Sequence, residues 1–176
     1  MNSAPHNKPS KPLGLGMLMA SFALGLVLLT MFFDGALEQR DNPNQVLQSQ
    51  HNSDGSVSID LQRNRQGHYV LRGLVNGHEV DFLLDTGATD VVIPESLAEE
   101  IGLEKLGRGA ANTANGTITI YRSRIDTLDI GDIHLRDVSA SINPSMGPGT
   151  ALLGMSALRK VEFSQSGNRL TLRQLP

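Results

Sequence analysis

The chain has 176 residues, a formal net charge of −3 and no cysteine. This length predicts one folded domain with room for an additional segment. The near-balanced charge leaves no basic stripe for nucleic acid, and an aromatic content of 4% offers few surfaces on which bases could stack. Without cysteine there is no disulfide, thiol nucleophile or thiolate metal ligand, and the redox compartment cannot be inferred.

Residues 13–33 form an uncharged, apolar stretch near the N-terminus. Its length matches the roughly 20 residues with which an α-helix crosses a bilayer. A buried core helix is seldom so uniformly apolar, and a cleaved signal peptide has a shorter apolar core of about 7–15 residues. We therefore expect an uncleaved, single-pass anchor. Because Lys8 and Lys11 precede it, the positive-inside rule predicts an internal N-terminus and a domain outside the inner membrane, in the periplasm where the cell has one.

Composition divides the rest of the chain into three parts. Residues 1–12 are polar with three prolines and are expected to be a cytoplasmic tail. Residues 34–55 are rich in Asn, Gln, Asp and Ser, which predicts a flexible linker because they bury too little apolar surface to fold alone. Residues 56–176 are then the folded domain, long enough for one modest core.

This domain is predicted to be mainly β. Residues 56–61 alternate polar and apolar side chains, as in a half-buried strand. Asn76-Gly77 separates two strand-like runs and predicts a tight hairpin, because both residues tolerate positive φ. Further strands are expected at 91–94, 117–121, 125–130, 133–142, 151–153, 161–165 and 169–173, with short helices at 95–101 and 154–160.

The tripeptide Asp85-Thr86-Gly87 carries the chemical signal. It lies between the apolar runs 80–84 and 91–94, and the segment Ala151-Leu152-Leu153-Gly154 follows far downstream. Asp85 supplies a carboxyl group, Thr86 a hydroxyl that can bond a neighbouring loop, and Gly87 a tight turn. An ordinary β-turn is the alternative, since all three residue types are common in turns.

Peptide hydrolysis by carboxylates needs two of them close together, sharing one proton. The ionised carboxyl then takes a proton from water while the protonated one polarises the scissile carbonyl. The chain has one Asp-Thr-Gly and no internal repeat, so it has few routes to such a pair other than a second copy. The histidines are dispersed without metal-ligand spacing, and we expect neither a metal nor a cofactor.

With these residues, the stretch from Asn76 to Pro94 resembles the retroviral-type (retropepsin-like) aspartic proteases, and most of all their membrane-anchored bacterial branch. Residues 151–155 are similar to that family's second segment. The resemblance implies a closed β-barrel half-lobe, a homodimer in which two copies of Asp85 form the dyad, and a mobile hairpin, the flap, over a peptide substrate.

By chain order, the resemblance places the flap at residues 113–117, with Asn115 and Gly116 against the substrate. It gives substrate-binding positions to Ala88, Thr89, Leu153 and Gly154. Thr89 replaces the Asp usual in viral enzymes, and the flap is less glycine-rich than theirs. Pepsin-like enzymes often carry a hydroxyl at the position of Ala88, where it can bond the carboxylate. Because alanine cannot, we expect a mildly rather than strongly acidic optimum.

The sequence thus predicts a membrane-anchored, homodimeric aspartic endopeptidase. Terminal strands such as 169–173 are candidates for the dimer sheet, and the linker 34–55 is an accessible place for self-cleavage. The first alternative is a non-catalytic module of the same fold that binds peptides or serves as a scaffold at the membrane. The second is a zymogen whose linker must be cut before dimers form.

Overall fold

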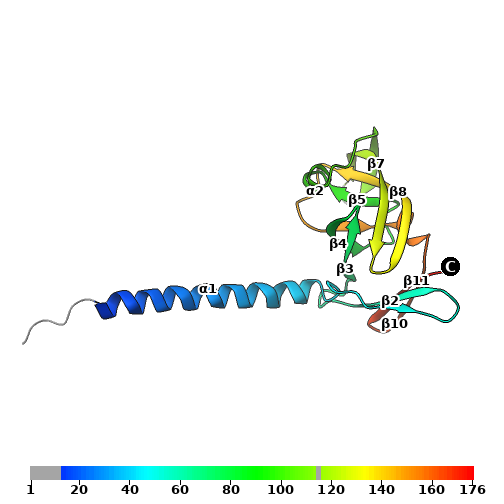
Figure 1. Cartoon of the computed structure of the whole chain (residues 1–176). Helices are drawn as coiled ribbons and strands as arrows, with labels where there is room; N and C mark the ends of the chain where they lie inside the picture. Colours follow the sequence, from blue (N-terminus) through cyan, green and yellow to red (C-terminus); the bar gives the residue numbers. More distant parts are fainter. Residues whose placement is uncertain (1–12, 114–115) are drawn as a thin grey trace, which may run out of the picture. The chain divides into compact units, whose positions relative to one another are not determined.

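The computed structural model describes residues 13–113 and 116–176. The chain divides into two compact units, with the boundary between Glu38 and Gln39. Helix α1 (Leu13–Asp41) makes up the described part of the first unit, and its last residues, 39–41, are counted in the second unit (Figure 1). Its stretch Gly14–Phe33 is exposed and is long and apolar enough to cross a membrane, as an anchor or a signal sequence.

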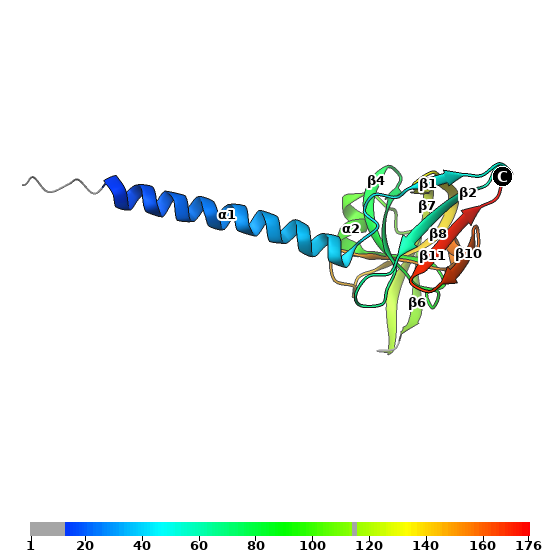
Figure 2. The ribbon, with the colours of Figure 1, turned by 90° about the horizontal axis from the view of Figure 1, so that it is seen from below.

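The second unit consists of two β-sheets. Sheet A has the strand order β3-β4-β9-β5-β8-β7-β6, and a further pairing between β3 and β7 closes it into a barrel (Figures 1 and 2). Its strands are β3 (Val70–Val75), β4 (His78–Leu84), β5 (Val91–Pro94), β6 (Gly107–Thr113), β7 (Gly116–Ile130), β8 (Ile133–Asn143) and β9 (Ala151–Leu153). The short helices are α2 (Glu95–Glu100) and α3 (Met155–Leu158). The prediction of a mainly β, closed fold is confirmed.

Sheet B is antiparallel and has the order β1-β2-β11-β10. Its strands are β1 (Ser49–His51), β2 (Val57–Gln62), β10 (Glu162–Ser166) and β11 (Arg169–Gln174). Alternate residues of β2 and β11 point into the core, where they join the fully buried Phe82 and Leu71 of the barrel. The opposite face is polar: Asp60 accepts hydrogen bonds from Arg169 at 3.1 Å and Thr171 at 2.6 Å.

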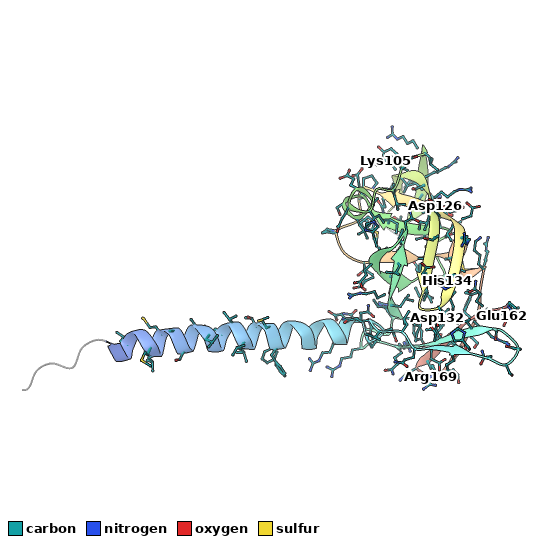
Figure 3. The ribbon with its side chains drawn as sticks, in the orientation of Figure 1. Lys105, Asp126, Asp132, His134, Glu162 and Arg169 are labelled. Carbon is teal, nitrogen blue, oxygen red and sulfur yellow. The ribbon has the colours of Figure 1, made fainter. Side chains whose placement is uncertain are left out.

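Polar contacts join sheet B to the barrel at the β7–β8 turn, where Figure 3 labels Asp132 and His134. The ring of His51 on β1 lies 2.8 Å from the carboxylate of Asp132. The side chain of Gln174 on β11 donates to the carbonyl of His134 at 2.8 Å. A Cβ on Gly131 would lie 2.7 Å from the Ser49 hydroxyl, so glycine permits the close approach of the two sheets here.

The linker expected over residues 34–55 differs from the structure. Helix α1 continues to Asp41, and the residues after it belong to the second unit. Asn42 and Asn44 are 4% exposed, and β1 pairs with β2. Polar composition suggested a solvated segment, whereas buried asparagines here satisfy backbone groups of the domain.

The strand at residues 169–173, which we expected as a candidate for the dimer sheet, has its edges paired within the chain. It forms β11, which lies between β2 and β10, so neighbours within the chain already pair both of its edges. The edge of sheet B on this side is β10, whose five residues are all exposed. Figure 2 shows β10 on the outside of this sheet.

Candidate active site

Two parallel strands bring Asp85 and Gly154 together. β4 pairs in parallel with β9, with Leu84 opposite Leu153, so the residues that follow both strands leave the sheet at the same edge. The backbone N–H of Asp85 donates to the carbonyl of Leu153 at 3.1 Å. The apolar runs before Asp85 and Gly154 therefore act as neighbouring strands, although they are far apart in sequence.

The loop after β4 turns back around the half-buried carboxylate of Asp85. The backbone N–H of Gly87 donates to Asp85 Oδ1 at 2.8 Å, and the N–H of Ala88 to the Asp85 carbonyl at 3.3 Å. A Cβ on Gly87 would lie 3.1 Å from Oδ1, closer than most Cβ contacts. Glycine thus leaves the carboxylate space and gives it a backbone donor.

Backbone N–H groups at the start of α3 donate hydrogen bonds to this loop. The N–H of Met155 donates to the carbonyl of Ala88 at 2.8 Å, and the N–H of Ser156 to that of Thr89 at 2.9 Å. A Cβ on Gly154 would lie 2.0 Å from the carbonyl oxygen of Asp90. Because only glycine fits, the loop and α3 are in direct backbone contact.

Two serine hydroxyls, which the sequence analysis did not identify, fix the far end of the loop. Ser156 Oγ accepts from the N–H of Val91 at 3.0 Å and donates to the carbonyl of Ser139 at 2.7 Å. Ser141 Oγ donates to the Asp90 carboxylate at 3.2 Å. The available signal was a hydroxyl two residues after Gly154, but its partners on β5 and β8 follow only from the tertiary fold.

Support also comes from Tyr69, the residue directly before β3. The N–H of Leu84 donates to the carbonyl of Tyr69 at 2.9 Å. The backbone around Asp85 is therefore held from two directions, by Tyr69 through Leu84 and by Leu153 directly. Tyr69 is buried, and its hydroxyl has no hydrogen-bond partner among the described residues.

The predicted site residues occupy different surroundings. Asp85 and Ala88 are half-buried, whereas Thr86, Gly87 and Thr89 are exposed. The hydroxyl of Thr86 bonds no other described residue of the chain. Leu153 is fully buried and Gly154 is packed under the loop, so within one chain both support the site rather than line a surface.

The segment predicted as a flap lies in a hairpin of β6 and β7, with Thr113 opposite Gly116 (Figure 2). Asn115 lies outside the described residues, while Gly116 is exposed with a φ of 110°. At the base of the hairpin, Lys105 contacts Glu95 at 2.6 Å and lies 4.9 Å from the centre of the Tyr121 ring. The hydrogen bond to Glu95 raises the pKa of Lys105 above its usual range, so it stays charged.

The site offers the carboxylate of Asp85, with its backbone fixed and its tip near solvent. The described residues contain no group of three acidic or histidine side chains that could hold a metal ion. A single carboxylate can orient and deprotonate a water molecule, but it cannot also protonate the scissile carbonyl oxygen. Hydrolysis of a peptide bond by carboxylates would therefore need a second acid beside Asp85.

Comparison with known proteins gives the family. Residues 71–160 match the model of the gag-polyprotein putative aspartyl protease family, and the chain belongs to this family. It is 30% identical over 116 residues to an uncharacterised protein from the cobV 5′ region of Sinorhizobium sp., covering 64% of this chain and 50% of that one. The chain thus spans about half the length of this relative.

Solved structures give the fold. A retropepsin-like aspartic protease from Rickettsia conorii superposes with a TM-score of 0.58 at 22% identity, covering 72% of this chain and 94% of that chain. The EIAV protease, complexed with the inhibitor HBY-793, gives a TM-score of 0.48 at 18% identity, over 56% and 92% of the two chains. The match to the Rickettsia structure shows that the fold is retropepsin-like.

Proposed function

We propose that the protein is an aspartic endopeptidase that acts as a homodimer, with Asp85 from each copy forming the catalytic dyad. The observation that carries this proposal is the Asp85 carboxylate, held by the N–H of Gly87 at 2.8 Å, on a backbone that is bonded to Leu153 of β9 directly and to Tyr69 through Leu84. Such rigidity keeps a reacting group in place and lowers the cost of reaching the transition state.

In the proposed dimer, one Asp85 is ionised and the other is protonated, because two carboxylates close enough to share a proton cannot both carry charge. The ionised group removes a proton from the attacking water. The protonated group donates to the carbonyl oxygen of the scissile peptide bond. Thr86, exposed and unbonded to the described chain, is available for a hydrogen bond to the second copy.

Two further features support dimerisation at a membrane. Strand β10 presents an exposed edge, and such edges are ready templates for pairing with another chain. An anchor formed by residues 14–33 would confine two copies to one plane and raise their effective concentration. We propose a single-pass protein of the inner membrane, with its N-terminus inside, whose domain cleaves peptides in the periplasm.

The test is peptide cleavage by the full-length protein in detergent, beside its Asp85→Asn variant. A mixed peptide library is scanned between about pH 3 and pH 7, because carboxylate dyads work on the acid side of neutrality. We expect cleavage that the variant lacks while its thermal unfolding is unchanged. Equal cleavage by both proteins would refute the proposal, and binding of peptides without cleavage by either would favour the non-catalytic module.

A further inference from the structure

The segment at the end of α1 pairs and forms hydrogen bonds with both sheets of the domain. We call residues 41–51 the strap. Asn44 forms a parallel bridge with Leu71 of β3, and its carbonyl accepts from the N–H of Arg72 at 3.3 Å. The strap then continues into β1, which pairs with β2. It therefore contacts both sheets within a few residues.

The side chain of Asn44 is the central contact of the strap. Its Nδ2 donates to the carbonyls of Gln62 at 2.9 Å and Val70 at 2.6 Å, and its Oδ1 accepts from the N–H of Gln62 at 2.7 Å. Gln62 is the last residue of β2 and Val70 the first of β3. Asn44 thus joins the two ends of the crossover that leads from sheet B into the barrel.

A second buried asparagine orders the crossover itself. Asn64 Oδ1 accepts from the N–H groups of Gln66 at 3.1 Å and His68 at 2.9 Å, and its Nδ2 donates to the carbonyl of Asp41 at 3.0 Å. Hydrogen bonds between asparagine side chains and backbone groups therefore join the start of the strap to residues 62–70. A removed partner would leave buried polar groups unpaired, which makes such networks rigid.

This crossover ends at the active site. Tyr69, next to Val70, accepts the hydrogen bond from Leu84 at 2.9 Å, and Leu84 immediately precedes Asp85. A shift of the Val70 carbonyl would move the neighbouring Tyr69 carbonyl, because they belong to consecutive residues. The support of Asp85 from the β3 side thus depends on a contact made by Asn44.

We propose that Asn44 is a positioning residue for catalysis: through the crossover it sets the Tyr69 carbonyl and, with it, the backbone of Leu84 and Asp85. This inference rests on the proposed protease function. It also means that a cut N-terminal to Asp41 leaves the site intact, whereas a cut between Asn42 and His51 impairs it.

The test compares Asn44→Ala with Asn52→Ala in the full-length protein. Asn52 is the matched control, because it is exposed and donates to the hydroxyls of Ser56 at 3.0 Å and Ser58 at 3.2 Å, away from the crossover. Active sites are counted by titration with a tight-binding transition-state analogue. We expect kcat per titrated site to fall about ten- to a hundredfold in Asn44→Ala, with KM little changed and Asn52→Ala like wild type.

A purely stabilising role gives a different result: fewer titratable sites or a lower Tm, but an unchanged kcat per site. That outcome would overturn the proposal. If Asn44→Ala fails to fold, Asn42→Ala replaces it, since it loses only the 3.1 Å contact to Asp81 and the 3.0 Å support of the Asn44 N–H. It should lower kcat per site in the same direction, and an unchanged value would overturn the proposal.

Amide hydrogen exchange gives a readout that needs no activity. We expect exchange at the Leu84 N–H to accelerate in the Asn44 variant, while the Met155 N–H, bonded to Ala88, stays as in wild type. Unchanged exchange at Leu84 would overturn the positioning role. A wild-type protein without peptidase activity would instead refute the proposed function, and the exchange result would still decide whether Asn44 positions the loop.

Discussion

Gly154 and Asp90 are in backbone contact: a Cβ on Gly154 would lie 2.0 Å from the Asp90 carbonyl oxygen and 2.8 Å from that of Ala88. Gly154→Ala must therefore displace the catalytic loop or α3. We expect a loss of about 3 kcal/mol or more in the free energy of unfolding, because moving the backbone of either the loop or α3 strains the structure. Chemical denaturation measures it.

The matched control for this substitution is Gly147→Ala. Gly147 lies in an exposed loop, and a Cβ there would meet no atom within 4 Å. Its stability should stay within about 0.5 kcal/mol of wild type. Equal effects of the two substitutions would contradict the close packing under the loop.

Ser156→Ala removes a hydroxyl that bonds Val91 at 3.0 Å and Ser139 at 2.7 Å. The N–H of Val91, a fully buried residue, then loses its partner, so we expect a loss of about 1–3 kcal/mol in unfolding free energy. Ser145→Ala, at an exposed loop position, is the control and should be neutral. A neutral Ser156→Ala would show that the loop does not depend on this hydroxyl.

Tyr69→Phe should leave stability unchanged or raise it by up to about 1 kcal/mol. Tyr69 is 7% exposed, and its hydroxyl is buried without a hydrogen-bond partner among the described residues. The substitution removes the free-energy cost of burying an unpaired hydroxyl and keeps the packing of the ring. Thermal unfolding measures the effect, and a clear decrease in Tm would reveal a partner for the hydroxyl.

Asp54 provides a prediction for pH. Hydrogen bonds from the Ser56 hydroxyl and backbone N–H, together with the charge of Arg173, lower the pKa of Asp54 below its ordinary 3.8. A lowered pKa in the folded state gives stability that is present above 3.8 and is lost as pH falls through the folded value. Because the group is solvent-exposed, we expect the effect to be small.

We therefore expect Asp54→Asn to have a slightly lower Tm than wild type near neutral pH, with the difference shrinking as the pH falls below 3.8. Tm values measured across this range test the sign. A difference that grows on acidification would contradict it.

Local sequence signals predicted the local structure well. Asn76 and Gly77 adopt φ values of 49° and 87° in the predicted hairpin, and helix α2 (Glu95–Glu100) lies within the predicted span 95–101. Apolar runs before Asp85 and Gly154 correctly indicated buried strands. These features depend on backbone preferences of single residues and on side-chain periodicity, which the sequence shows directly.

The errors concern long-range contacts. Asn42 and Asn44 lie in a segment with the composition of a linker. In the structure, however, Asn42 bonds the carboxylate of Asp81, and the Asn44 amide bonds backbone carbonyls where the chain crosses between sheets. Likewise, the pattern of residues 169–173 predicts a strand but not its central place in sheet B. Pairing partners depend on tertiary packing, so no local pattern specified them.

The most direct test of the dimeric dyad adds Asp85→Asn protein to a fixed amount of wild type, at concentrations where the dimer is saturated and subunits exchange. Mixed dimers carry only one ionisable dyad member and should be inactive. At equal amounts we expect activity to fall to about one half, because random pairing gives half of the wild-type chains an inactive partner. Activity that is unchanged by a large excess of the variant would contradict a dyad shared between two chains.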